Sequence, residues 1–536
     1  MTTNTPRALT PFEGCDIRTL VDSQAERFGS RRFLIWEPYE GEGRTWTYAQ
    51  FADTLRRFAA GLQARGVKPG ERVLVHLDNC PESVIAWLGC AYAGAVAVTT
   101  NARSSQEELA YFAAHSGAVA GITQPRFAAL MAAAAPQLRW QVVTRTDNGA
   151  PAQADSSAFV PFGAFEPFDA IDADPDTLAE RPRDPWAPFS IQYTSGTTSR
   201  PKAVLWTHAN ALWGARVNAD HEDLRADDVH MVQLPLFHTN AQAYSILASL
   251  WVGARFVLVP KFSGSRFWDL SLKHGCTWAS MIPFFVRALL GKPVPPHSYR
   301  LWGSGICSPE YDRIFGVKTI GWWGMTETVS HGTVGLPHHP NASMSMGRAA
   351  PEYGIHVLDD DGQPVKPGET GDLYVAGVCG VSLFLEYFND PAATAAAFRE
   401  DGLFRTGDRV RVGEDGFLYF GDRSKDMLKV GGENVAASEV ERVIMTVPGV
   451  QEVAVVAKKD RMLDEVPVAF VIAWPGQEGG LAQRIEAACR SGLADFKRPR
   501  EVRLVASMPR ATLEKVAKAQ LRALLEAEGR EPARAA

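Results

Sequence analysis

A loop of small, hydroxylated residues between two apolar segments constrains the fold of this chain more than any other feature. The loop runs from Thr194 to Ala203, and apolar residues approach it at 189–193 and follow it at 204–206. This pattern predicts a strand, a tight loop and a second strand. Backbone N–H groups and hydroxyls in such a loop can converge on negative charge, so the loop predicts a site for the oxygens of a polyphosphate.

The loop does not fit the Walker A motif, the most familiar phosphate loop. That motif requires a second glycine and a Mg²⁺-binding hydroxyl at fixed spacings after Gly196. Pro201 and Ala203 stand at those two positions. The loop alone leaves open a simpler alternative, an ordinary surface turn rich in serine and threonine.

Length and composition indicate a globular protein with more than one domain. The 536 residues exceed what one hydrophobic core usually serves. The net charge of −6 provides no basic surface for nucleic acid or an anionic membrane. The seven cysteines are scattered without a C-x-x-C pair, and the chain has no signal peptide or long apolar run. We therefore expect free thiols and a cytoplasmic location.

Hydrophobic periodicity predicts an α/β architecture for the first part of the chain. Strand patterns at 72–76 and 94–98 alternate with helical patterns at 81–93 and 104–115. Such alternation is typical of a largely parallel sheet that helices cover on both faces. Ser105 and Glu108 have the spacing of a capping box for the second helix.

The pattern changes twice towards the C-terminus. Residues 347–387 are rich in strand and turn signals, which predicts a small barrel-like β-layer appended to the α/β core. A separate α+β pattern begins near residue 425 and continues to the end of the chain, a reasonable size for a small domain. We therefore predict a large domain over residues 1–425 and a small domain over residues 426–536.

The hydroxylated loop closely resembles the phosphate loop of the adenylate-forming enzymes, the superfamily of acyl-CoA synthetases, luciferases and peptide-synthetase adenylation domains. The family pattern is Tyr/Phe-Thr-Ser-Gly-Ser/Thr-Thr-Gly-x-Pro-Lys-Gly, and Ser199 and Ala203 replace two of its glycines. The resemblance implies that the phosphates of ATP are bound by Thr194, Ser195, Gly196, Thr197, Thr198 and Lys202.

The segment Trp322–Thr328, Trp-Trp-Gly-Met-Thr-Glu-Thr, is similar to a second motif of this superfamily. The resemblance implies that Trp323 packs on adenine, Thr326 contacts phosphate and Glu327 holds Mg²⁺. The chemistry agrees, since an indole offers a flat stacking surface and a carboxylate beside a triphosphate needs a bridging cation. Taken alone, the segment is also compatible with a tryptophan pair in a core.

Two further motifs resemble the ribose-binding residues of the family. Phe404–Asp408 matches a clamp in which Asp408 accepts both ribose hydroxyls, and Arg423 matches a second contact to ribose and phosphate. The surrounding Asp-Arg-x-Lys-Asp sequence is similar to that of acyl-CoA synthetases. Lys425 then matches the hinge about which the small domain of the family turns, so the resemblance implies a mobile C-terminal domain.

The C-terminal domain carries two segments that resemble family motifs. Gly431 and Gly432 match a loop that lines the tunnel for the pantetheine arm of CoA, where a side chain would obstruct the thiol. Lys515 matches the catalytic lysine, although Glu514 stands where the family has glycine. Lys518 is the alternative for this role.

The resemblance also implies a pocket for the carboxylic acid. His238 matches a histidine beside the acyl group, and the remaining pocket residues are Trp302, Gly303, Ser304, Gly305 and Trp322. Bulky indoles leave little room for a long chain, which favours a small acid. Several stretches look like the carnitine/crotonobetaine-CoA ligases and one resembles aryl-CoA ligases, so both acid classes remain open.

Together these motifs predict an ATP-dependent acid–CoA ligase that forms an acyl-adenylate and then a thioester. The implied cofactor and co-substrates are Mg²⁺, ATP and CoA, with no nucleic-acid or membrane partner and a monomeric or homodimeric state. Two alternatives remain: an enzyme that delivers the acyl group to a carrier-protein phosphopantetheine, and a catalytically silent nucleotide-binding protein. Ser199, Ala203 and Glu514 are the only support for the silent protein.

Overall fold

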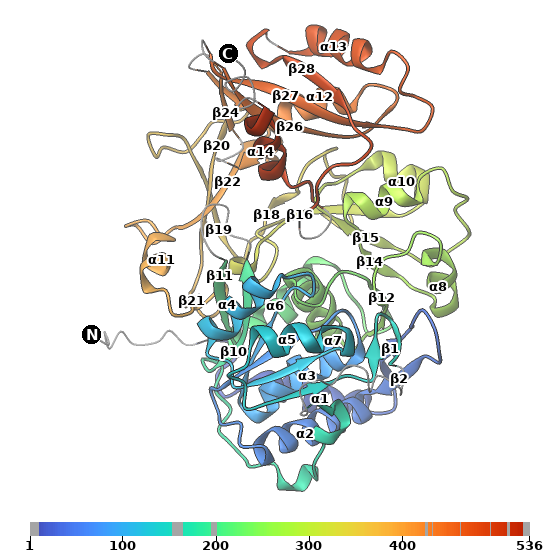
Figure 1. The fold of residues 1–536 in the computed structure, drawn as a ribbon, viewed down its shortest axis with the longest axis vertical. Helices are drawn as coiled ribbons and strands as arrows, with labels where there is room; N and C mark the ends of the chain where they lie inside the picture. The colour runs from blue at the N-terminus through green and yellow to red at the C-terminus, as the bar shows by residue number, and fades with distance from the viewer. Residues whose placement is uncertain are drawn as a thin grey trace, which may run out of the picture. The chain divides into compact units, whose positions relative to one another are not determined.

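The computed structural model describes most of the chain (Figure 1). By its internal contacts, the chain forms two compact units. The described residues are 10–152, 165–194, 201–423, 427–430, 433–460, 463–493, 495–511 and 515–528. The first unit comprises Met1–Ile355 and Val375–Phe404, and the second comprises His356–Tyr374 and Arg405–Ala536. The predicted boundary at Lys425 lies outside the described residues and stays a prediction.

The first unit contains an eight-stranded sheet that carries the hydroxylated loop. Its strand order is β21 (Glu386–Tyr387), β11 (Lys202–Thr207), β10 (Pro188–Thr194), β4 (Val96–Thr99), β3 (Arg72–His76), β5 (Ala120–Thr123), β6 (Trp140–Val143) and β9 (Phe165–Pro167). All pairs from β10 to β9 are parallel, whereas β10–β11 and β11–β21 are antiparallel. The predicted covered, largely parallel sheet is therefore confirmed.

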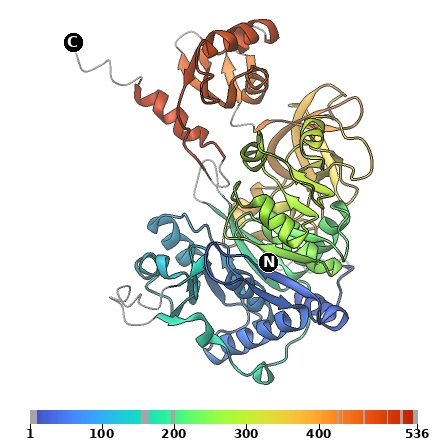
Figure 2. The ribbon, with the colours of Figure 1, turned by 90° about the vertical axis from the view of Figure 1, so that its right-hand side faces the viewer.

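Helices flank this sheet on both faces, as the blue-to-cyan elements of Figures 1 and 2 show. On one face, α4 (Gln106–Ser116) and α5 (Ala128–Ala134) bury their apolar residues against the strands. On the other face, α3 (Pro81–Ala93) packs on α2 (Tyr48–Ala64) and brings Trp87 against Phe189 of β10. The predicted capping box at α4 is present, because Ser105 and Glu108 exchange hydrogen bonds of 3.2 and 2.8 Å.

A nine-stranded sheet completes the first unit. Its strand order is β18 (Arg348–Ala349), β17 (Thr333–Val334), β16 (Lys318–Trp323), β15 (Leu301–Ser304), β14 (Trp278–Ser280), β12 (Val229–Val232), β13 (Arg255–Leu258), β1 (Arg32–Trp36) and β2 (Arg44–Thr47). The helical elements between β11 and β16 in the chain are α6 (His208–His221), a π-helix η5 (Asn240–Leu247), α7 (Ala248–Val252), α8 (Phe267–His274), α9 (Pro283–Leu289) and α10 (Pro309–Phe315). A π-helix is rare and often marks a functional site.

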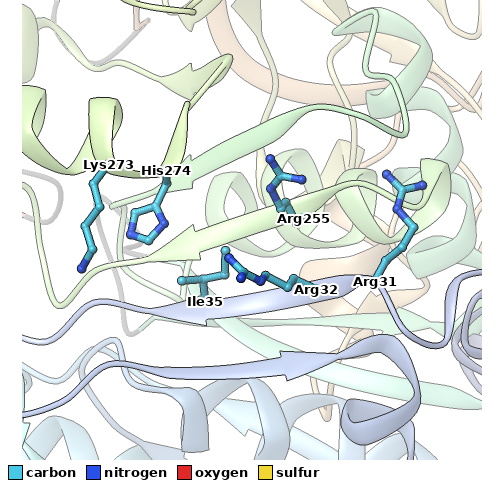
Figure 3. A pocket seen from close by; sticks show the side chains of 6 residues that line it. All are labelled: Arg31, Arg32, Ile35, Arg255, Lys273 and His274. Carbon is cyan, nitrogen blue, oxygen red and sulfur yellow. The ribbon is translucent and has the colours of Figure 1, made fainter.

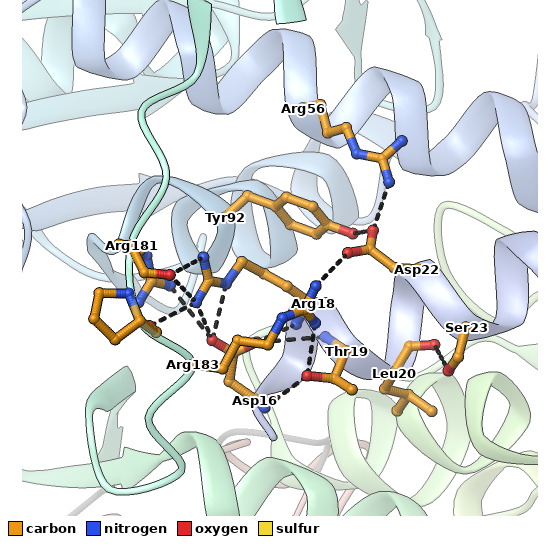
Figure 4. Close-up of polar contacts among 11 residues, drawn as sticks. Asp16, Arg18, Thr19, Leu20, Asp22, Ser23, Arg56, Tyr92, Arg181 and Arg183 are labelled. Atoms are coloured by element: carbon orange, nitrogen blue, oxygen red, sulfur yellow. Dashed lines mark hydrogen bonds and ion pairs between the residues drawn. The ribbon is translucent and has the colours of Figure 1, made fainter. Parts of the chain in front are cut away.

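A buried carboxylate fixes the start of α1 (Ile17–Phe28) to the connection that precedes β10 (Figure 4). Asp16 accepts hydrogen bonds from the Arg18 backbone and guanidinium, and Arg18 in turn donates to the carbonyl of Pro182 at 2.8 Å. Burial alone would raise the pKa of Asp16, but the Arg18 hydrogen bond and nearby positive charges hold it below its usual value. The network therefore ties the approach of β10 to the helical layer.

The second unit contains two smaller sheets. One has the order β19 (Gly354–Leu358), β20 (Thr370–Ala376), β22 (Phe404–Val412) and β23 (Leu418–Arg423). The other contains β25 (Glu433–Ala436), β24 (Met427–Val430), β27 (Asp464–Ala473) and β26 (Val450–Asp460), with β28 (Glu501–Leu504) paired to β27. By its internal contacts, the predicted β-layer at 347–387 is divided between the units, with His356–Tyr374 in the second and the remainder in the first.

Alternating side chains of β26 and β27 give the five-stranded sheet two apolar faces. Val455 and Val471 pack with α12 (Ala437–Met445) and α13 (Leu481–Gly492) on one face. Val456 and Phe470 pack with α14 (Lys518–Glu528) on the other. A sheet with helices on both faces has its own core, which confirms the α+β class predicted for the C-terminal region.

Candidate active site

The two strands predicted around the hydroxylated loop form an antiparallel pair. Thr194, at the end of β10, lies opposite Lys202, at the start of β11, and its hydroxyl donates to the Lys202 carbonyl at 3.5 Å. The predicted residues Ser195, Gly196, Thr197 and Thr198 lie outside the described residues. The two strands nevertheless fix both ends of the loop, since they pair from Pro188 to Thr194.

Tyr387 of β21 connects two of the predicted site residues. The ammonium of Lys202 lies 4.5 Å from the centre of the Tyr387 ring, and the Tyr387 hydroxyl donates to Glu327 Oε1 at 2.8 Å. Burial and the Glu327 charge both raise the pKa of Tyr387, so the phenol remains protonated and can donate. Lys202 and Glu327 therefore contact the same aromatic residue, one at its ring and the other at its hydroxyl. Sequence reasoning missed this residue.

The neighbouring Thr326 belongs to a chain of polar groups from three different segments. Thr239, immediately before the π-helix, has its hydroxyl 3.2 Å from Thr326 Oγ1 and 3.1 Å from Gln192 Oε1 of β10. The indole of Trp206 in β11 donates to the Thr326 carbonyl at 2.9 Å. These bonds hold Thr326 and Glu327 beside the strands that carry the loop.

His238 precedes Thr239 and is half-buried. Its ring lies 4.3 Å from that of Phe237, and its carbonyl accepts from Gln242 in the π-helix at 3.1 Å. Because Thr239 is within hydrogen-bonding distance of Thr326, the chain brings His238 to the same region as the Trp322–Thr328 motif. Its predicted role beside the acid stays a prediction.

The two predicted tryptophans of β16 lie at its carboxyl end and are largely buried. Trp322 stacks with Trp278 at 5.8 Å and with His331 at 4.3 Å between ring centres. A Cβ atom on Gly303 would lie 1.7 Å from the Trp322 ring, so only glycine fits there. Trp322 and Gly303 are therefore in direct contact, as an acid pocket built from both requires.

Trp302 does not lie with Trp322 and Gly303. It is fully buried and packs with Phe267, Tyr299 and Phe315, at ring distances of 6.0, 5.7 and 5.0 Å. Along β15 neighbouring side chains point to opposite faces, so Trp302 and the Gly303 position cannot share a pocket wall. Of the remaining predicted pocket residues, Ser304 is buried and Gly305 is exposed.

The second unit carries the predicted ribose-binding pair. Asp408 of β22 lies opposite Arg423 of β23 in the antiparallel ladder, and its backbone N–H donates to the hydroxyl of Thr406 at 3.1 Å. The Asp408 side chain is almost fully buried. Two residues that are 15 positions apart in the sequence thus lie opposite each other in the sheet, as a common ligand would require.

The structure separates the two lysines proposed for catalysis. Lys515 is exposed and follows residues 512–514, which lie outside the described residues; its carbonyl accepts from the Ala511 N–H at 2.7 Å. Lys518 begins α14 and forms an ion pair of 2.8 Å with Glu441 of α12. Lys518 therefore has a structural partner within the small domain. Lys425, Gly431 and Gly432 lie outside the described residues.

Comparison with known proteins decides the family. The chain matches the AMP-binding enzyme family over residues 21–388 and the AMP-binding enzyme C-terminal domain over residues 439–515. The chain belongs to the AMP-binding enzyme family. The predicted adenylate-forming superfamily is therefore confirmed for both parts of the chain.

Similar proteins of this family include CoA ligases. The crotonobetaine/carnitine–CoA ligase of Escherichia coli O139:H28 is 34% identical over 526 residues, which cover 95% of this chain and 99% of the relative. An anthranilate CoA ligase, AuaEII, in complex with anthranoyl-AMP is 25% identical with a TM-score of 0.85, covering 97% of this chain and 99% of the other. A benzoate CoA ligase from Burkholderia xenovorans LB400 is 25% identical with a TM-score of 0.81, covering 95% and 99%.

These relatives confirm the predicted class, ATP-dependent acid–CoA ligation through an acyl-adenylate, and the predicted mixed α/β fold with a smaller C-terminal domain. Over the part of the chain that the structure describes, no helix has the length and apolar character needed to cross a membrane.

Proposed function

We propose that this protein converts a small carboxylic acid into its CoA thioester in two steps. In the first, a carboxylate oxygen attacks the α-phosphorus of ATP, and pyrophosphate leaves. In the second, the CoA thiolate attacks the carbonyl carbon of the acyl-adenylate, and AMP leaves with the electron pair of the broken C–O bond. The contact of Lys202, Tyr387 and Glu327 beside the loop carries the proposal, because it joins the phosphate and metal functions.

Neither step needs a nucleophile from the protein. Adenylation requires in-line placement of the reacting groups and neutralisation of the negative charge that spreads over the phosphates. Lys202 and the loop hydroxyls would hold the β- and γ-phosphates, while Asp408 and Arg423 would hold the ribose. Lys515 would contact the carboxylate and α-phosphate oxygens during the first step.

The residues present fit a Mg²⁺ ion, which would supply positive charge to the phosphates of bound ATP. Mg²⁺ in nucleotide sites usually takes one or two protein carboxylates and fills its other positions with phosphate oxygens and water. Glu327 is a largely buried carboxylate, and the Tyr387 hydroxyl fixes one of its oxygens at 2.8 Å.

The second step requires access for the CoA thiol. We propose that the small domain turns about Lys425, so that Lys515 serves adenylation and the Gly431–Gly432 loop serves thioester formation. Domain rotation of this kind lets one site serve two reactions in turn. The resemblance of Lys425 to the hinge of the family supports this proposal, whereas the last boundary between the two compact units falls between Phe404 and Arg405.

The aromatic residues around Gly303 favour a small acid. A Cβ atom at this position would lie 1.7 Å from Trp322 and 2.5 Å from Trp278, so both indoles occupy the space directly beside the strand. An acyl chain that enters past Gly305 would soon meet these rings. A long aliphatic tail therefore has no room unless both tryptophans move.

A buried carboxylate next to this aromatic group favours an acid that carries a positive charge. Glu222 is fully buried, neither of its oxygens accepts a hydrogen bond from the described residues, and Oε1 lies 3.8 Å from His331 Nε2. Burial and the charge of Asp228 raise the pKa of Glu222 well above its usual value. His331 stacks on Trp322, so the carboxylate lies just behind the proposed pocket wall.

A quaternary ammonium group would suit this arrangement. It makes no hydrogen bonds, is attracted to aromatic faces and would stabilise the ionised form of a nearby carboxylate. The 34% identical E. coli relative is a crotonobetaine/carnitine–CoA ligase, which supports the same acid class. An aryl acid, suggested by the benzoate and anthranilate ligases, carries no positive charge that could stabilise the ionised form of Glu222.

A panel of acids tests the proposed substrate class. We expect the highest kcat/KM, measured as acid-dependent AMP release with CoA present, for carnitine or γ-butyrobetaine, with lower values for benzoate, butyrate and a long-chain fatty acid. The physical reasons are the short pocket and the Glu222 charge. The highest value for a long-chain acid would contradict the small-acid proposal, and benzoate above both betaines would place the enzyme among aryl ligases.

A further inference from the structure

A second group of charged side chains lies in a pocket of about 320 Å³ on the first unit (Figure 3). Five of its six lining residues are basic: Arg31, Arg32, Arg255, Lys273 and His274, with Ile35 as the sixth. They come from the starts of the neighbouring parallel strands β1 and β13 and from the end of α8. Such a concentration of basic groups is unexpected in a chain whose net charge is −6.

One carboxylate accompanies these basic groups. Lys273 and His274 both hydrogen-bond to Glu37 Oε1, at 2.6 and 2.7 Å. Burial alone would raise the pKa of Glu37, but the hydrogen bonds and charges of Lys273 and His274 lower it below its usual value, so Glu37 is ionised near neutral pH. It can balance only one of the four permanent cations, Lys273 included.

No carboxylate among the described residues forms an ion pair with any of the three arginines. Arg31 donates to the backbone carbonyl of Ala226, which is neutral, and its guanidinium lies over the ring of Phe28. Neither Arg32 nor Arg255 forms an ion pair or a side-chain hydrogen bond with any residue that the structure describes. Guanidinium groups offer flat, forked donors that match the oxygens of phosphate, and three of them in one pocket repel each other unless an anion is present.

We propose that this pocket binds a phosphate anion of two or more negative charges, at a site separate from the catalytic one. The pocket belongs to β1 and β13 of the nine-stranded sheet, whereas the hydroxylated loop joins β10 and β11 of the eight-stranded sheet. The proposal therefore stands independently of the catalytic assignment. Free pyrophosphate and the phosphates of CoA share the required chemistry, and both occur in the proposed reaction.

Calorimetric titration of the full chain separates this site from the phosphate loop. Two proteins are compared. Both carry Lys202→Ala, which weakens phosphate binding by the loop, and one of them also carries Arg32→Ser and Arg255→Ser. Each protein is titrated separately with pyrophosphate and with CoA. We expect the affinity of the anion that uses the pocket to fall at least roughly tenfold with the added pair, because two guanidinium groups that can donate charged hydrogen bonds are removed. The anion whose affinity falls more, pyrophosphate or CoA, is the one that the pocket binds.

A control variant removes the same charge elsewhere. Arg313 and Arg490 are exposed and do not line the pocket, so Arg313→Ser with Arg490→Ser changes net charge equally without touching it. We expect no loss of affinity in this control, and an unchanged thermal midpoint in both double variants shows that each is folded. Equal affinities in the pocket and control variants, or no binding of either anion to the Lys202→Ala protein, would overturn the proposal.

Discussion

Replacing Lys515 with alanine is expected to slow acyl-adenylate formation by about 10²–10³-fold, the usual effect of removing one preorganised electrostatic donor. The loss arises because negative charge develops on the carboxylate and α-phosphate oxygens in the transition state, and no other proposed residue neutralises it there. Pyrophosphate release in a single turnover measures this step. Thioester formation from a supplied acyl-adenylate should persist, since the second step does not use Lys515.

Lys518→Ala is the matched control. Lys518 is ion-paired with Glu441 at 2.8 Å, so its loss should affect how the start of α14 is held within the small domain more than adenylation. We expect near wild-type pyrophosphate release from this variant. A Lys515→Ala enzyme with wild-type release and a Lys518→Ala enzyme without it would reverse the assignment.

Glu222→Gln is expected to lower kcat/KM for a cationic acid by a factor of at most roughly 30. If the two unit charges lie about 8 Å apart, they attract by about 2 kcal/mol at an effective dielectric constant of about 20, and the free energy needed to ionise the buried Glu222 reduces the effect below this limit. The probes are 4-(trimethylammonio)butanoate and 5,5-dimethylhexanoate, which have nearly the same shape but differ in charge. The neutral acid should react equally well or better with the variant.

This comparison distinguishes the specificity proposal from the proposed reaction. AMP release with the neutral acid reports on ligase chemistry, whereas the ratio of the two acids reports on Glu222. Glu82→Gln is a suitable control, because Glu82 is also buried but is already paired with Arg44 at 2.9 Å. An unchanged ratio in Glu222→Gln, or the same change in Glu82→Gln, would show that Glu222 does not select the charge of the acid.

The local sequence was sufficient to predict the elements of the fold. The helix predicted at 81–93 is α3, the strand predicted at 72–76 is β3, and the capping box at Ser105 and Glu108 is formed. These features depend on periodicity and hydrogen bonds between near neighbours in the sequence. Adjacency along the chain does not show which strands pair, so the sequence could not reveal that the predicted β-layer at 347–387 is divided between two compact units.

The missed site residues share one property: their role depends on contacts between distant segments. Tyr387 belongs to a two-residue strand, and only its pairing with β11 brings it between Lys202 and Glu327. Glu222 follows α6 and reads as an exposed charge at a helix end, although packing buries it completely. The sequence around a single glutamate next to apolar helix residues does not predict that its side chain is buried.

The tryptophans show a different limit. Trp302 and Trp322 both occur in strands buried on both faces, so hydrophobic alternation cannot reveal which face each indole occupies. The structure places Trp302 among Phe267, Tyr299 and Phe315, and Trp322 against Gly303. Resemblance to the family indicated the strands of the proposed acid pocket, whereas the orientation of each indole required the structure.

Acid-dependent AMP release, measured with and without CoA on the same enzyme preparation, tests the central claim most directly. We predict slow, stoichiometric pyrophosphate release without CoA, and continuous release of AMP with equimolar acyl-CoA when CoA is added. Acid-dependent exchange of pyrophosphate into ATP without any thioester on free CoA would contradict CoA as the acceptor and favour a carrier protein. The absence of both exchange and AMP release with every acid in the panel would contradict ligase activity itself.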